Sequence, residues 1–220
     1  YEGQVVSEAA PGIYWVGARG NWFPSRGGPF TSFDLLFRYP KRLELVATGT
    51  QLESVVEGEE RITRWKPDGP IRVAGFNLGE YERTSVKVGD YTIEVCANKR
   101  LEPALQPPPP PTLPLPEQSV FPPRRFPPRP APVLPMPLPE PPQAPTARLE
   151  QVARESAQAL EFFVSRFGPP PLRHLTISPL PGRFGQGFPG LVYISTLSYY
   201  EQQDRPLEKL SQEARVFFSE

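Results

Sequence analysis

Residues 172–195 read LRHLTISPLPGRFGQGFPGLVYIS, and this stretch decides the fold of the last third of the chain. Leu172–Ser178 and Leu191–Ser195 are rich in β-branched and large apolar residues, which is typical of buried strands. Glycine and proline are concentrated between them, which predicts a loop. The stretch therefore predicts a strand, a glycine-rich loop and a second strand.

A helix is predicted on each side of these strands. Before them, apolar residues recur at three- and four-residue spacing, which predicts one buried face of a helix of about five turns. Thr146 can cap its start, Gly168 can end it, and Pro169–Pro171 prevent its continuation. A second helix is predicted from Asp204, with Pro206 in its first turn. The predicted faces are Leu149, Val152, Ala153, Ser156, Ala159, Leu160, Phe163 and Phe167 in the first helix, and Leu207, Leu210, Ala214 and Phe217 in the second.

The first hundred residues predict antiparallel strands. Residues 33–39, 43–47 and 91–95 place apolar side chains at alternate positions, the mark of half-buried strands. Asp68-Gly69 and Gly89-Asp90 suit tight turns. Short strands with frequent turns favour a β-sandwich over a parallel sheet.

A proline-rich stretch separates the two patterns. Residues 103–145 hold 20 of the 33 prolines, so they exclude helix and sheet interior and predict an extended linker. We therefore predict an α+β chain with a β-sandwich domain at 1–102, a linker at 103–145 and an α/β part at 146–220. Arg129–Pro135 matches ligands of SH3-type domains, but a spacer is the interpretation that we favour.

The composition excludes several classes of function. The 24 basic and 24 acidic side chains cancel, so nothing predicts a nucleic-acid partner. Cys96 and His174 are the only cysteine and histidine, which excludes an internal disulfide and any site that needs two histidines. No apolar run approaches the ~20 residues of a membrane span.

Two motifs in the last segment are distinctive. Phe162–Pro171 reads FFVSRFGPPP, and Gly185–Ser195 reads GQGFPGLVYIS. The first is similar to the helix end and following turn, and the second to the glycine-rich loop and strand, of aminopeptidase N-like zinc metallopeptidases of the membrane alanyl aminopeptidase type. In the first segment, Trp22–Pro24, Val46–Gly49 and Gly75–Tyr81 are similar to the later part of the family's N-terminal β domain. The resemblance covers most of residues 13–98 and 147–218.

The resemblance implies a segment of a peptide-hydrolysing enzyme. Residues 146–220 would be the α/β opening of a thermolysin-like catalytic domain, and the remaining catalytic domain would be a partner. The family's His-Glu-x-x-His zinc motif lies shortly after the helix that ends this chain. We therefore expect no catalytic residue, metal ligand or cofactor here, zinc only in a longer protein, and no activity from this chain alone. The family also suggests an extracytoplasmic or cell-envelope location.

The resemblance assigns substrate binding to Gly185, Gln186, Gly187 and Phe188. At the corresponding loop the family has Gly-Ala-Met-Glu-Asn, whose glutamate pairs with the free amino group of the substrate and falls on Gly187. A peptide could still add to the edge of the strand through its backbone. The alternative is an ordinary loop between two strands.

Other interpretations remain open from the sequence. The chain could be a non-catalytic module that binds peptides or proteins through its β surface and proline-rich linker, or part of a pseudoenzyme. His174 is expected to be structural or on the surface. Trp15, Trp22 and Trp65 are expected to be core residues rather than a carbohydrate-binding surface.

Overall fold

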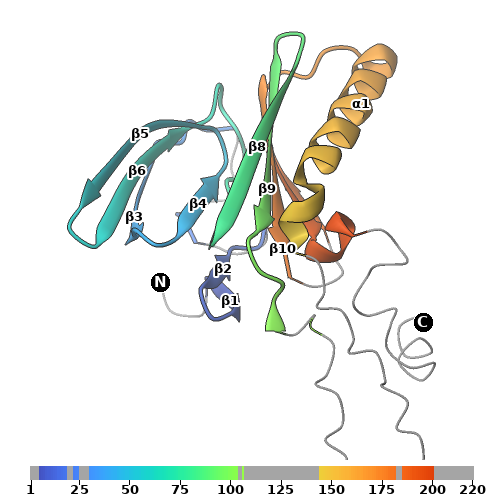
Figure 1. Cartoon of the computed structure of the whole chain (residues 1–220). Coiled ribbons are helices and arrows are strands. Elements are labelled where there is room, and N and C mark those ends of the chain that lie inside the picture. The colour runs from blue at the N-terminus through green and yellow to red at the C-terminus, as the bar shows by residue number, and fades with distance from the viewer. Residues whose placement is uncertain are drawn as a thin grey trace, which may run out of the picture.

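The computed structural model describes residues 5–18, 22–24, 30–103, 106, 144–181 and 185–200. Within them the chain forms three β-sheets and one long α-helix (Figure 1). Most of the proline-rich segment and the helix predicted from Asp204 lie outside the described residues.

An antiparallel three-stranded sheet consists of β3 (Leu35–Pro40), β5 (Thr50–Glu57) and β6 (Glu60–Lys66), in the order β3-β6-β5. The predicted alternation is confirmed in β3, where Tyr39 is buried and Leu36 is exposed. Tyr39 and Trp65 point toward a core that this sheet shares with the next one.

A four-stranded antiparallel sheet consists of β1 (Ser7–Ala10), β2 (Ile13–Trp15), β4 (Glu44–Ala47) and β7 (Phe76–Gly79), in the order β1-β2-β7-β4. Leu45 and Phe76 lie in the same buried cluster as Tyr39 and Trp65. Two antiparallel sheets therefore share one apolar core in the first part of the chain.

A five-stranded sheet has the order β11-β12-β10-β9-β8, with β9, β10 and β12 parallel to one another. Its strands are β8 (Tyr81–Val88), β9 (Tyr91–Asn98), β10 (His174–Leu180), β11 (Gln186–Phe188) and β12 (Leu191–Ser195). The strand predicted at Leu191–Ser195 is confirmed, and the one predicted at Leu172–Ser178 lies two residues further on. The sheet takes strands from both sides of residues 103–145, and the predicted division of the chain there stays a proposal.

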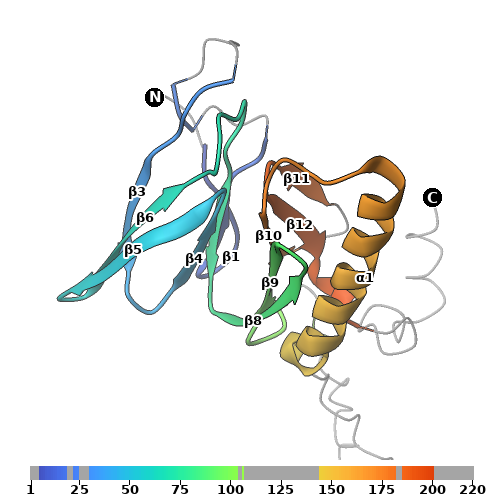
Figure 2. The same cartoon turned by 90° about the horizontal axis from the view of Figure 1, so that it is seen from above.

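The helix α1 (Leu149–Phe167) covers one face of the five-stranded sheet, and the four-stranded sheet covers the other (Figure 2). The predicted cap at Thr146 is wrong, because a 3-10 turn, η2 (Pro145–Arg148), precedes the helix and Arg148 occupies the cap position. Gly168 ends α1 as predicted, with a φ of 82° that favours glycine. The described part of the chain contains no helix whose length and apolar character would suit a membrane crossing.

The predicted buried face of α1 is correct only for its first half. Leu149, Val152 and Ala153 are buried against the sheet. Phe163 is 55% exposed and Phe167 is 80% exposed. The described strands cover the beginning of the apolar stripe and leave its end uncovered.

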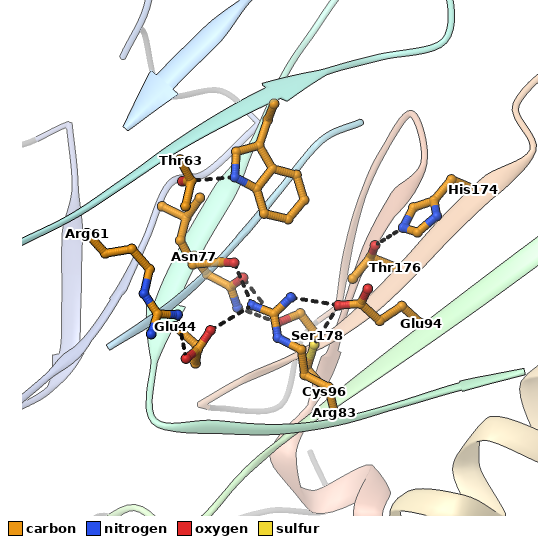
Figure 3. Close-up of polar contacts among 12 residues, drawn as sticks. Glu44, Arg61, Thr63, Asn77, Arg83, Glu94, Cys96, His174, Thr176 and Ser178 are labelled. Carbon is orange, nitrogen blue, oxygen red and sulfur yellow. Dashed lines mark hydrogen bonds and ion pairs between the residues drawn. The ribbon is translucent and has the colours of Figure 1, made fainter. Parts of the chain in front are cut away.

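A chain of ion pairs joins the three sheets (Figure 3). Glu44 of β4 accepts from Arg61 of β6 at 2.8 Å and from Arg83 of β8 at 3.5 Å. Arg83 also donates to Glu94 of β9 at 2.8 Å and to the Leu45 carbonyl at 2.7 Å. Its side chain is 24% exposed, so these contacts are made largely out of water. Arg83 is therefore the common donor that ties β4 to β8 and β9.

Replacing Arg83 tests this role. Arg83→Met should lower the free energy of unfolding by about 1.5–3 kcal/mol, because it leaves the partly buried Glu94 carboxylate and the Leu45 carbonyl without their charged donor and leaves Glu44 with Arg61 alone. Arg64→Met is the matched control: Arg64 pairs with Asp34 at 2.6 Å, but its side chain is 42% exposed. This control should lower the free energy of unfolding clearly less than Arg83→Met does, because an exposed ion pair contributes little to stability. Equal losses for the two variants in urea unfolding would contradict the assignment.

Candidate functional site

The residues predicted to bind a substrate lie at the edge of the five-stranded sheet. Gln186–Phe188 forms β11, which pairs antiparallel with β12 through Gln186 and Tyr193, Gly187 and Val192, and Phe188 and Leu191. On its other side no strand is present among the described residues. An edge strand offers unpaired N–H and C=O groups to an incoming strand.

Gly187 in β11 and Gly185 directly before it have different surroundings. Gly187 is exposed, and a Cβ atom added to it would meet nothing within 4 Å. A Cβ atom at Gly185 would lie 3.0 Å from the Tyr193 carbonyl oxygen, so glycine there lets the two backbones approach closely. Gly187 is thus the position in β11 where an added side chain would meet no neighbouring atom. Gly185 instead lets the backbone pass close to the backbone of β12.

Gln186 lies beside the four-stranded sheet. Its side chain is half-buried, and a Cβ atom added at Gly17 would lie 3.9 Å from its Oε1 and 3.6 Å from the Trp15 ring. Gln186 and Trp15 therefore flank the same glycine next to the sheet edge. Trp15 belongs partly to the core, as predicted, because it packs against the cluster that contains Phe188 and Tyr193.

The side chain of Phe188 points into the protein. Phe188 is 5% exposed, and its ring meets Tyr193 edge to face with centroids 5.3 Å apart. A Cβ atom added at Gly75 would lie only 2.4–2.6 Å from the Phe188 ring. Phe188 therefore packs over Gly75, just before β7, and can meet a peptide only through its backbone.

Adding a methyl group at Gly75 tests this contact. Gly75→Ala should destabilise the protein by about 1–3 kcal/mol, because the Phe188 ring fills the space that the Cβ atom needs. Gly69→Ala is the control, since a Cβ atom there meets nothing within 4 Å. Its effect should stay within about 0.5 kcal/mol in the same urea titration. A control that costs as much as Gly75→Ala would show that the ring contact is not the cause.

The single histidine and the single cysteine of the sequence both lie in the five-stranded sheet. The Nε2 atom of His174 lies 3.0 Å from Oγ1 of Thr176 on the same strand (Figure 3). Burial raises the pKa of the Cys96 thiol, and the nearby Arg83 opposes that shift only partly. A buried thiol of this kind is a poor nucleophile. The described residues contain no group of three or more His, Cys, Asp or Glu side chains that could hold a metal ion.

A buried polar cluster that the sequence did not predict lies where β9 and β12 end. Glu102 is 2% exposed, and its Oε1 accepts hydrogen bonds from Thr196 Oγ1 at 2.6 Å and from Asn98 Nδ2. Its Oε2 has no hydrogen-bond partner among the described residues. Burial raises the pKa of the Glu102 carboxyl, although the Thr196 and Asn98 contacts lower it in part. The cluster joins the end of β9 to the turn η3 (Thr196–Tyr199).

The raised pKa of Glu102 has a consequence for stability. Because the folded-state pKa of Glu102 lies above the usual pKa of a glutamate, the native state holds the proton more tightly than the unfolded state. The protonated Glu102 carboxyl therefore stabilises the native state below the pKa that it has in the unfolded chain. This stabilisation is lost as the pH rises through the pKa that Glu102 has in the folded protein. Glu102→Gln should remove this loss, so the stability of the variant relative to the wild type should increase as the pH rises above the usual pKa of a glutamate, about 4.3. Glu82→Gln, at an exposed position, should follow the wild-type curve. An advantage for Glu102→Gln that does not change with pH would contradict the assignment.

No protein family model and no curated protein matches the chain. Several solved structures, however, match it. The M1 zinc metallopeptidase of Deinococcus radiodurans matches with a TM-score of 0.53 and 16% identity, over 84% of this chain and 36% of that one. A mutant of it bound to a Tyr-Ser-Ala substrate also matches with a TM-score of 0.53 and 16% identity, over 88% of this chain and 38% of that one.

A two-domain M1 zinc metallopeptidase mutant bound to L-arginine matches with a TM-score of 0.53 and 15% identity, over 93% of this chain and 38% of that one. The chain thus spans 36–38% of the length of these structures. At this level of identity the likeness concerns the fold. The chain has the fold of part of an M1 zinc metallopeptidase.

Proposed function

We propose that this chain is the β domain and the opening of the catalytic domain of an M1-type peptidase, and that it holds a peptide substrate along β11. The observation that carries the proposal is the open edge at Gln186–Phe188 in a fold shared with M1 zinc metallopeptidases. One of those neighbours was solved with a Tyr-Ser-Ala substrate, which supports a peptide as the ligand.

The residues of this chain do not fit a zinc ion. The sequence has one histidine and one cysteine, and the described residues hold no group of three ligands. An open zinc site needs three protein ligands. We therefore propose that the zinc ion, the glutamate that activates water and the hydrolysis belong to a longer protein. These 220 residues alone should not hydrolyse a peptide.

The chemistry of the edge favours recognition of a peptide backbone. Neither β11 nor β12 carries a charged side chain. Gly187, which takes the place of the glutamate in the resembling family, offers no carboxylate to a free amino group. A peptide would therefore be held by main-chain hydrogen bonds, as a strand added to the sheet, without a requirement for a free N-terminus.

A pair of variants at Gly187 tests both parts of the proposal. The probes are two fluorescent hexapeptides that begin with Tyr-Ser-Ala, one with a free and one with an acetylated N-terminus. The wild-type chain should bind both with equal affinity. Gly187→Glu should prefer the free amine by about two- to fivefold, the range of an exposed ion pair. Gly187→Gln, which has nearly the same shape without the charge, should show no preference.

The same peptides test the edge itself. A strand that adds to one sheet edge donates to it from every second amide, so N-methylation in one of the two alternating patterns should abolish binding to the wild-type chain. Binding that survives methylation in both alternating patterns would rule out strand addition. Peptide binding by a native polypeptide whose mass matches this chain would favour the non-catalytic module over the peptidase. An SH3-type partner for the linker and a cell-envelope location stay proposals.

A further inference from the structure

The strand β5 is an edge of the three-stranded sheet. The sheet has the order β3-β6-β5, so β6 pairs with one side of β5, and no strand among the described residues pairs with the other. Every residue of β5 after Thr50 is exposed. Figure 2 shows the hairpin of β5 and β6 extending away from α1 and the five-stranded sheet. In the described structure, the N–H and C=O groups on this edge are therefore available to a further strand.

β5 lacks the residues that usually protect an edge strand. Natural proteins keep exposed edges from pairing with other chains by means of lysine, proline or very short strands. β5 is eight residues long and contains no Lys, Arg or Pro. The other edge strand of the same sheet, β3, carries Arg38 and ends in Pro40. β5 instead exposes the apolar side chains of Leu52, Val55 and Val56 to 53–54%.

The hairpin shows which backbone groups of β5 point to the free edge. Gly58 and Glu59 join β5 to β6, and the φ of 60° at Gly58 suits the first central position of a II′ turn. The residues that flank a two-residue loop form a hydrogen-bonded pair, so Glu57 directs its N–H and C=O to β6. Hydrogen-bonded and non-hydrogen-bonded pairs alternate along antiparallel strands. Ser54 and Val56 therefore direct their N–H and C=O groups to the free edge.

A second copy of β5 fits this edge when the two strands run antiparallel with Ser54 opposite Ser54. Leu52 of each copy then lies opposite Val56 of the other, so exposed apolar side chains meet on one face of the sheet. On the other face, Glu53 lies opposite Val55. Because the backbone groups of Ser54 and Val56 point to the free edge, these residues can exchange hydrogen bonds with the second copy.

The charges of β5 favour this register. It places no glutamate opposite another, since Glu57 of one copy faces Gln51 of the other. With Val55 at the centre, Glu53 would face Glu57 twice, and like charges directly opposite each other destabilise a sheet. The irregularity in the pairing of β5 with β6 lies between Gln51 and Glu53, at the end of the paired stretch, and leaves the register regular after it.

We propose that the chain forms a two-fold symmetric dimer in which β5 pairs with β5 of a second copy. The two three-stranded sheets then form one continuous six-stranded sheet. The same strand supplies both halves of the interface, as a two-fold axis requires. The interface lies in a different sheet from β11, so the dimer leaves the edge at Gln186–Phe188 free for a peptide.

Sedimentation equilibrium of the full 220-residue chain tests the dimer. The wild type should show a concentration-dependent equilibrium between monomer and dimer. Ser54→Pro removes the N–H donor at the centre of the interface and keeps the hydrogen bonds to β6, so it should weaken the dimer at least about tenfold. Ser54→Ala keeps this donor and should dimerise as the wild type does. A wild type that stays monomeric at every concentration would overturn the proposal, as would a Ser54→Pro variant that dimerises equally well.

Cysteine cross-linking tests the register and decides the question if Ser54→Pro fails to fold. In the proposed dimer the two Ser54 Cα atoms lie about 5.5 Å apart, within the range of a disulfide. Ser54→Cys should therefore give a disulfide-linked dimer on mild oxidation, read by non-reducing electrophoresis. Ser85→Cys is the matched control, because Ser85 is also an exposed serine of an edge strand, β8. The native Cys96 is buried and common to both variants.

The two cross-linking rates separate the proposed interface from random collision. Ser54→Cys should cross-link at least about tenfold faster than Ser85→Cys, since only the first pair is held within reach of a disulfide. Equal rates for the two variants would overturn the proposal.

Discussion

The fold depends on covering the five-stranded sheet on both faces. Three of its strands, β9, β10 and β12, are parallel, and parallel strands are stable only when both faces are buried. Ile93 and Val95 of β9 pack under α1, while Cys96 of the same strand packs toward the four-stranded sheet. The five-stranded sheet therefore requires a covering layer on each face. The helix α1 covers one face and the four-stranded sheet covers the other. Asn77 of β7 secures the second contact by donating to Ser178 of β10 at 2.7 Å.

The sequence predicted elements whose signal is local. Leu191–Ser195 is an apolar run bounded by glycine and proline, and the alternation in residues 33–39 needs only its own side chains to be recognised. Periodicity also located the face of α1. Periodicity does not show how far along the helix the covering sheet extends. Phe163 and Phe167 were therefore expected to be buried, and they are exposed.

The site was predicted only in part, because its details depend on distant residues. The position of β11 at a sheet edge follows from the pairing of β12 with β10, which no local pattern specifies. The burial of Phe188 depends on Gly75, more than a hundred residues away in the sequence. Glu102, between Leu101 and Pro103, gives no sign in the sequence that its carboxyl is buried.

The proline-rich segment leaves and re-enters the fold at neighbouring points. Glu102, just before it, is tied to Thr196, and η2, just after it, packs beside both β9 and η3. The two ends are therefore held together by the folded parts on either side. For a chain closed between fixed ends, doubling the length adds only about 0.6 kcal/mol to the entropic cost of closure. Insertions and deletions within residues 107–143 should thus accumulate through evolution with little effect on the fold, so the length of this segment is open to selection for purposes other than stability.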